Sequence, residues 1–300
     1  MNILVVGAGS IGVYLGVMLS KKGHEVILLG RSKLKNLHDT ILIGQNVYKL
    51  PKRVYKFPKD KNYDFIFVTS KLYDLESNLR RIKENNLKSK YLISIQNGIV
   101  ENSIYEKYTK ETQFSSISVF EGFRIIENQL IVNQSKSGWK TDNSNAGKET
   151  EKILQSAGIN CTSEKNLDSI KAEKTLMNCC VNVLSAIKKK TFYELCNDSK
   201  TKKIMDEIFD ETYKILSLEY KLKPKEKLKE LFYQIISPMK HYSSTYQDAI
   251  SNRKTEVWFL NQLIIRIAKK HNSSAKANGK IVEEFFKKYP SPENPKHQPN

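Results

Sequence analysis

Apolar positions follow two different rhythms along the chain, and the change of rhythm divides it into two halves. In the first half, short apolar runs of strand length alternate with amphipathic helical segments, which is typical of a parallel sheet with crossover helices. The runs predict strands at Asn2–Val6, Glu25–Leu29, Asp64–Ser70, Tyr91–Ile95 and Ile159–Thr162, and helices at Asp74–Asn86 and Ala146–Ala157.

Two further stretches of the first half have β character without a helix between them. Thr40–Leu50 predicts an extended segment, and Phe114–Asn133 contains short β segments joined by turn residues. The second stretch predicts antiparallel strands that extend the sheet.

Helical periodicity takes over near residue 165, where we place a domain boundary. Ser169–Ile187 is apolar or small at nearly every position from Leu176 onward, so it predicts a helix that is buried on most sides. A second stretch, His241–Ile267, contains Ser243-Ser244 as a loop or helix start, and Thr255-Glu256 opens an apolar helix.

A glycine motif lies between the first strand and the helix that follows it. Gly7, Gly9 and Gly12 have the spacing G-x-G-x-x-G, with Ala8, Ser10 and Ile11 between them. The first glycine allows a tight turn, the second lets a pyrophosphate approach the backbone, and the third lets the helix pack closely on the strand. Strand, motif, helix and second strand together predict dinucleotide binding.

These patterns predict an α/β Rossmann-type dinucleotide-binding domain followed by an all-α C-terminal domain. The nucleotide-binding domain spans residues 1–165 and a helical substrate and catalytic domain spans 166–289. The proline-rich residues 290–300 form a tail that we predict to be disordered.

The end of the second strand bears on the choice of cofactor. A site for NAD usually has an acidic residue there to bind the ribose 2′-hydroxyl, but this chain has Arg31 and Ser32. These residues can hold a 2′-phosphate, so we expect NADPH/NADP⁺. In the alternative interpretation Arg31 is an ordinary surface residue of a basic protein.

Two polar residues follow other strands. Lys71 comes just after the third strand, and Asn97 lies in Gln96-Asn97-Gly98 after the fourth. Because ligands of open α/β sheets bind at the carboxyl ends of strands, Lys71 is placed to meet cofactor or substrate, and Asn97 to bond substrate or nicotinamide. The alternatives are a surface lysine and a turn asparagine.

The predicted helix Ser169–Ile187 carries three polar side chains on one stripe. Lys174, Asn178 and Asn182 are spaced four residues apart, which keeps them within about 80° of arc on a helix. Burying a cation and two amides without partners costs several kcal/mol. The stripe therefore predicts the lining of a polar cleft, with a satisfied core network as the alternative.

Composition limits the remaining possibilities. The net charge of +18 comes mostly from lysines scattered along the whole chain, so we expect a solvated basic surface without a specific nucleic-acid partner. The four cysteines have neither zinc spacing nor a redox C-x-x-C pattern, and no metal site is predicted. No apolar run is long enough for a membrane span and no basic leader precedes the first strand, so we expect a cytoplasmic protein.

Taken together, the motifs resemble the ketopantoate reductase (2-dehydropantoate 2-reductase) family from residue 1 to about residue 285. The resemblance rests on the ordered set GAGSIG at 7–12, Lys71, QNG at 96–98, K-x-x-x-N-C-x-x-N at 174–182, S-S-x-x-Q-D at 243–248 and T-E at 255–256. The chain departs from the family pattern at Val183, Trp258, Gln262, Asn272, Ser273 and Lys276, and keeps Asn278.

The resemblance implies a function for each of these positions. Lys174 is the implied general acid, and Glu256 supports the lysine, the reacting oxygen and the cofactor. Lys71 is implied on the cofactor side of the cleft. The implied substrate-binding residues are Asn97, Asn178, Asn182 and Ser244, and Asn97 also contacts the cofactor.

We therefore expect NADPH-dependent reduction of ketopantoate to pantoate for coenzyme A synthesis, by a monomer or homodimer that acts on a small 2-oxo acid. One alternative is a related reductase of another 2-oxo acid or carbonyl compound. A second is an NADPH-binding sensor without catalysis, which would not need both Lys174 and Glu256. From position alone, Glu256 is also compatible with an N-terminal helix acid that interacts with the helix dipole.

Overall fold

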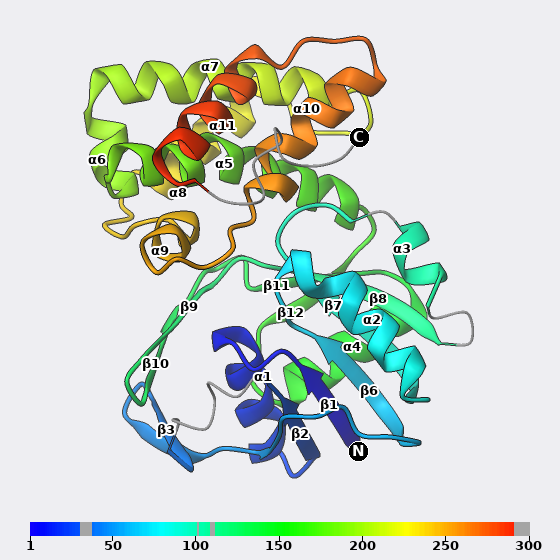
Figure 1. Ribbon diagram of the computed structural model, residues 1–300. Helices are drawn as coiled ribbons and strands as arrows, with labels where there is room; N and C mark the ends of the chain where they lie inside the picture. The colour runs from blue at the N-terminus through cyan, green and yellow to red at the C-terminus, as the bar shows by residue number, and fades with distance from the viewer. Residues whose placement is uncertain (31–37, 101, 109–111, 291–300) are drawn as a thin grey trace. The chain divides into compact units, whose positions relative to one another are not determined.

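The computed structural model describes residues 1–30, 38–100, 102–108 and 112–290 (Figure 1). It divides into two compact units, Met1–Leu167 and Asp168–Asn300. In the described ranges, no helix is both long enough and apolar enough to cross a membrane. The residues of the predicted tail from 291 onward lie outside the described residues.

The first unit is built on an eight-stranded sheet with the order β12-β11-β8-β7-β6-β1-β2-β5. Strands β5, β2, β1, β6, β7 and β8 are parallel, and they reproduce the 3-2-1-4-5-6 order of dinucleotide-binding sheets. The strands are β1 (Asn2–Val6), β2 (Glu25–Leu29), β5 (Lys52–Val54), β6 (Asn62–Val68), β7 (Lys88–Ile95), β8 (Gln113–Val119), β11 (Trp139–Asp142) and β12 (Cys161–Glu164).

Helices pack against this sheet because its central strands are apolar on both faces. Ile3 to Val6 of β1 are at most 2% exposed, as expected for a central parallel strand. Helix α1 (Ser10–Lys21) packs against β1 and β2, and α4 (Asn145–Ser156) packs against β7, β8 and β11. The remaining helices of the unit are α2 (Leu75–Glu84) and α3 (Asn102–Glu106).

The prediction for residues 114–133 was wrong in its topology. Strand β8 extends the main sheet as a parallel strand, and its antiparallel neighbour is β11, which the sequence pattern did not predict. Strands β9 (Gly122–Ile126) and β10 (Gln129–Asn133) join β3 (Thr40–Ile43) and β4 (Asn46–Lys49) in a second sheet, ordered β4-β3-β10-β9.

Aromatic packing accounts for the departure of β9 and β10 from the main sheet. The Phe123 ring of β9 lies 4.9 Å from the ring of Tyr14 in α1 and 6.0 Å from that of Trp139 in β11. Trp139 is fully buried. Burying this aromatic cluster favours a hairpin folded over α1, because each large ring removes much apolar surface from water.

The second unit is helical in its described part, as predicted. Its helices are α5 (Leu167–Lys188), α6 (Phe192–Asn197), α7 (Ser199–Leu216), α8 (Lys225–Ile236), α9 (Ser244–Ile250), α10 (Asn261–Lys270) and α11 (Lys276–Lys288). Cys179 and Cys180 of α5 are fully buried, which confirms that this helix lies in the core of the unit.

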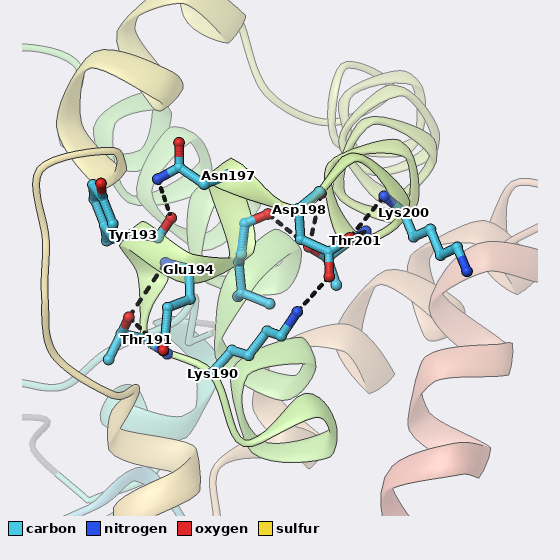
Figure 2. Close-up of polar contacts among 9 residues, drawn as sticks. Lys190, Thr191, Tyr193, Glu194, Asn197, Asp198, Lys200 and Thr201 are labelled. Atoms are coloured by element: carbon cyan, nitrogen blue, oxygen red, sulfur yellow. Dashed lines mark hydrogen bonds and ion pairs between the residues drawn. The ribbon is translucent and has the colours of Figure 1, made fainter.

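Figure 2 shows how side chains cap the two helices that follow α5. Thr191 and Glu194 form a reciprocal capping box at the start of α6, and Asp198 accepts hydrogen bonds from the backbone N–H groups of Lys200 and Thr201 at the start of α7. Lys190 pairs with Asp198. The capping satisfies backbone donors that helix starts leave unpaired, so it stabilises the starts of α6 and α7.

The helix expected to open at Thr255-Glu256 begins later. Glu256 comes directly before a 3₁₀ turn, Val257–Phe259, and α10 starts at Asn261. The apolar pattern did not distinguish a 3₁₀ turn from the first turn of an α-helix. Glu256 therefore lies on an irregular segment rather than in a helix.

Candidate active site

The glycine loop of the first unit is packed tightly on one side and open on the other. A Cβ atom at Gly7, where φ is +114°, would lie 2.6 Å from the Ser70 nitrogen, and one at Gly12 would lie 1.9 Å from the Gly7 carbonyl oxygen. A Cβ at Gly9 would meet nothing within 4 Å. The loop therefore needs Gly7 and Gly12 for its own packing and leaves the backbone at Gly9 accessible.

Helix α1 begins in the manner of a phosphate-binding helix. No side chain caps it at Gly9, and its first turn contains no acidic residue. The first N–H groups of an α-helix have no acceptor within the helix, and the helix dipole gives them partial positive charge. Ala8, Ser10 and Ile11 are partly exposed beside this start, so the loop has the donors that a pyrophosphate requires.

Hydrogen bonds fasten together the strand ends around the loop. The Thr69 hydroxyl donates to the Gly7 carbonyl oxygen, and the Gln96 side-chain amide donates to the carbonyl oxygens of Val68 and Ser70 at 2.7 and 3.3 Å. The strand order reverses between β1 and β6, and ligands of open α/β sheets bind at such a switch point.

Lys71 follows Ser70 and Asn97 follows Gln96, the two residues joined by these hydrogen bonds, and both are partly buried. The structure therefore brings them to the edge of the sheet where the glycine loop lies. Arg31 and Ser32, the predicted 2′-phosphate residues, lie outside the described residues. The preceding residue, Gly30, donates through its N–H to the Val54 carbonyl oxygen at 3.1 Å.

One polar atom tests whether this edge fits a dinucleotide. The Ser70 hydroxyl is buried and has no hydrogen-bond partner among the described residues. It belongs to the residue whose backbone packs against Gly7. A buried unpaired hydroxyl is costly, and a bound phosphate or ribose oxygen would satisfy it. The residues present therefore fit a dinucleotide.

The second group of predicted residues lies in the helical unit. On α5, Lys174 and Asn178 are partly buried and Asn182 is 7% exposed, whereas the neighbouring Cys179 and Val183 are fully buried. The predicted stripe is thus a polar face on a helix that is otherwise enclosed.

Glu256 acts electrostatically on the lysine of this stripe. Burial lowers the pKa of Lys174 to about 8, and the nearby Lys171 lowers it as well, whereas the charge of Glu256 opposes the change. Glu256 itself is only 6% exposed. The structure therefore brings the predicted general acid and its predicted supporting carboxylate together, and the desolvated amine titrates close to neutral pH.

The residue before Ser244, Ser243, is hydrogen-bonded to α5. The Ser243 hydroxyl donates to the Asn182 carbonyl oxygen at 2.8 Å and accepts the Tyr246 N–H at 3.0 Å. The Ser185 hydroxyl accepts the Ser243 N–H at 3.2 Å. Ser244 is exposed as the first residue of α9, so α9 begins one residue after a hydrogen bond to Asn182 of α5.

Several residues that organise the two groups were not predicted from the sequence. Gln96 and Ser243 stand directly beside predicted residues, and their hydrogen-bonding side chains at a strand end and a helix start were available signals. Ser70 and Asn261 have no such signal, because their importance depends on burial. Asn261 donates to the Cys179 carbonyl oxygen of α5 at 3.0 Å.

Comparison with known proteins matches both units to one family. Residues 3–141 match the family described as ketopantoate reductase PanE/ApbA, and residues 166–287 match the family described as its C-terminal part.

Individual relatives are distant in sequence and similar in fold. A 2-dehydropantoate 2-reductase of Aquifex aeolicus (strain VF5) is 24% identical over 94% of this chain and 95% of its own length. A PanE/ApbA family ketopantoate reductase from Ralstonia eutropha JMP134 is 21% identical with a TM-score of 0.84, over 96% of this chain and 99% of that one. A ternary structure of D-mandelate dehydrogenase with NADH and anilino(oxo)acetate is 22% identical with a TM-score of 0.84, over 96% and 98%.

The solved structures share the α/β fold with its helical C-terminal unit, and the family matches cover most of both units. They confirm the resemblance seen in the motifs, so the chain belongs to the ketopantoate reductase family of oxidoreductases.

Proposed function

We propose that the protein is an NADPH-dependent reductase of ketopantoate, a 2-oxo acid, with pantoate as its product. The observation that carries the proposal is the pairing of Lys174 and Glu256 on an otherwise enclosed helical core. A lysine with a pKa near 8 is an effective proton donor at physiological pH. A merely structural lysine would not need such an environment.

In this reaction Lys174 donates a proton to the oxygen that develops negative charge at the C2 carbonyl. Desolvation lowers the pKa of the amine, which makes the ammonium group a stronger acid. Glu256 keeps a sufficient fraction of the lysine protonated, because its charge acts against the desolvation. The two effects together set the acidity.

The substrate is bound by amide and hydroxyl groups. Asn178 and Asn182 continue the lysine's stripe along α5, and Ser244 lies beside Asn182 through the Ser243 hydrogen bond. These groups, with Asn97 added by the family resemblance, would bond the 2-oxygen, the carboxylate and the far hydroxyl of ketopantoate. Such hydrogen bonds discriminate strongly against analogues that lack the hydroxyl.

The glycine loop from Gly7 to Gly12 would hold the cofactor, and the family resemblance adds Lys71, Asn97 and Glu256, with Arg31 and Ser32 assigned to the 2′-phosphate. A bound nicotinamide would supply the hydride that reduces C2. The preference for NADPH over NADH rests on the sequence Arg31-Ser32 in place of an acid. A D-mandelate dehydrogenase of similar fold was solved in complex with NADH. The choice between NADPH and NADH is therefore measured directly in the experiment below.

A second candidate is a reductase of a different 2-oxo acid. Trp258 lies two residues after Glu256, and its ring is 5.1 Å from the guanidinium carbon of Arg266, which also donates to the Trp258 carbonyl oxygen at 3.0 Å. The family pattern has Asp where this chain has Trp258, and this exchange two residues after Glu256 favours the second candidate, because it replaces a small acid with a large aromatic side chain.

The experiment is a substrate panel with purified protein, in which NADPH or NADH oxidation is followed with ketopantoate, 2-ketoisovalerate and pyruvate. We expect ketopantoate with NADPH to give the highest kcat/KM. A clear preference for 2-ketoisovalerate would select the second candidate, and equal rates with NADH would overturn the cofactor assignment.

We also place the enzyme in the cytoplasm, since its four cysteines are free.

A further inference from the structure

A buried hydrogen-bond chain crosses the helical unit at the first residue of α10. The Asn261 side chain is fully buried. Its Nδ2 donates to the Cys179 carbonyl oxygen of α5 at 3.0 Å and to Asn278 Oδ1 of α11 at 2.8 Å. Both hydrogens of this amide are used, and the two acceptors come from two other helices.

The far end of the chain fixes the orientation of the amides. Asn278 Nδ2 donates to Glu211 Oε1 at 2.9 Å and to Thr212 Oγ1 at 3.0 Å, both in α7. Glu211 also accepts the backbone N–H groups of Ala277 and Asn278 at 2.9 Å each. Because the side-chain N–H groups of Asn278 face α7, only its side-chain oxygen faces Asn261. The Asn261 side chain must therefore be the donor in the bond between them.

The bond to α5 is not needed for the helix itself. In an α-helix the carbonyl of residue 179 accepts the N–H of residue 183, and position 183 is valine, which has that N–H. The Asn261 amide therefore adds a second hydrogen bond to a carbonyl in the middle of a helix. Its physical effect is to fix α10 against one point of α5.

The hydrogen bond between Asn261 and Cys179 lies at the same distance in sequence from the two charged residues of the site, Lys174 and Glu256. Cys179 lies five residues after Lys174 on α5, and Asn261 lies five residues after Glu256, with the 3₁₀ turn Val257–Phe259 and Leu260 between them. The bond thus joins the helix that carries the lysine to the segment that carries the carboxylate. The carboxylate's segment is not part of an α-helix, so contacts with other elements fix its position.

We propose that Asn261 is a positioning residue, whose hydrogen bond to the Cys179 carbonyl holds the Glu256 segment against α5 at the separation from Lys174 that proton donation requires. The inference rests on the proposed function, because proton donation by Lys174 is the reason given for this geometry. The geometry itself is independent of which 2-oxo acid is the substrate.

The charged groups that act on Lys174 define the expected signature. Among the described residues these include Glu256, from the segment that Asn261 holds, and Lys171, from α5 itself. Glu256 raises the pKa of Lys174. If the Asn261 bond is lost and the segment moves away, this influence weakens and the pKa of Lys174 falls. A merely structural loss would lower stability without this shift.

The test compares Asn261→Leu with Thr212→Val by following the acylation of Lys174 as a function of pH. Acetic anhydride reacts with the neutral amine, and peptide mass spectrometry reports the extent at Lys174, with no substrate present. Thr212→Val removes one acceptor of Asn278 in the same network and leaves the Cys179 bond, so it is the matched control for stability.

We expect Asn261→Leu to move the half-titration of Lys174 to lower pH by about half a unit or more, and Thr212→Val to leave it unchanged while lowering the thermal midpoint. In turnover, Asn261→Leu should lower kcat about tenfold. If Asn261→Leu does not fold, Asn261→Ala, which removes the donor without adding bulk, gives the same readout.

A Lys174 titration in the Asn261 variant that equals that of the wild type would overturn the positioning role, as would an equal shift in Thr212→Val. Because acylation needs no substrate, it decides this inference separately from the proposed function. The proposed function fails if the wild type reduces no 2-oxo acid, whatever the titration shows.

Discussion

Glu256 and the burial of Lys174 act on the lysine's pKa in opposite directions, and the resulting value is about 8. The proposed general acid must be protonated to react, so kcat/KM for 2-oxo acid reduction should fall as the pH rises above about 8. Glu256→Gln removes the influence that raises the pKa, so the falling limb should move to lower pH. The measurement is kcat/KM against pH for both proteins.

A matched variant moves the limb in the other direction. Lys171 lowers the pKa of Lys174, so Lys171→Gln should raise it and shift the falling limb to higher pH. Opposite shifts from the two variants would assign the limb to Lys174. A limb that stays in place in both variants would mean that another group titrates.

Alanine substitutions at Gly9 and Gly12 of the glycine loop should differ in their effect on stability. Gly9→Ala meets open space, and its φ of −76° and ψ of −174° suit alanine, so the protein should fold normally but bind NADPH at least tenfold more weakly, because the methyl group covers the backbone at the phosphate site. Gly12→Ala places Cβ 1.9 Å from the Gly7 carbonyl oxygen, so it should lower the thermal midpoint as well.

The control for these variants is Gly279→Ala in α11, where a Cβ also meets nothing within 4 Å. It should increase stability by about 0.5–1 kcal/mol, as alanine does in helices, and leave NADPH binding unchanged. Thermal unfolding and NADPH fluorescence titration measure all three. Unchanged NADPH affinity in Gly9→Ala would contradict the assignment of the loop.

Ser70 provides a separate test of the cofactor site. Its hydroxyl is buried without a partner among the described residues, so Ser70→Ala should leave the stability of the protein without cofactor equal or higher. If the hydroxyl bonds the bound dinucleotide, the same variant should weaken NADPH binding by about 0.5–1.5 kcal/mol. A loss of stability without any loss of affinity would show that the hydroxyl has a structural partner.

The elements that position the two groups were largely predictable from the sequence. The buried strands β1, β2, β6 and β7 are continuous apolar runs, and the stripe of Lys174, Asn178 and Asn182 follows from helical periodicity alone. These features depend on local patterns, which a sequence displays directly.

What the sequence did not reveal depends on contacts between distant segments. The short strand β11 contains Lys140 and Asp142 and has no apolar run, and β9 and β10 leave the main sheet because Phe123 packs on Tyr14 and Trp139. The Asn261–Cys179 bond joins residues 82 positions apart. Tertiary packing of this kind overrides local preference.

The most direct test of the account is the effect of Lys174→Ala on the reduction of ketopantoate by NADPH, measured beside the variant's NADPH affinity. The account predicts that kcat falls at least 10²-fold, as is typical when a general acid is lost, while the dissociation constant for NADPH changes little. A variant that reduces ketopantoate at nearly the wild-type rate would contradict the assignment of Lys174 as the proton donor.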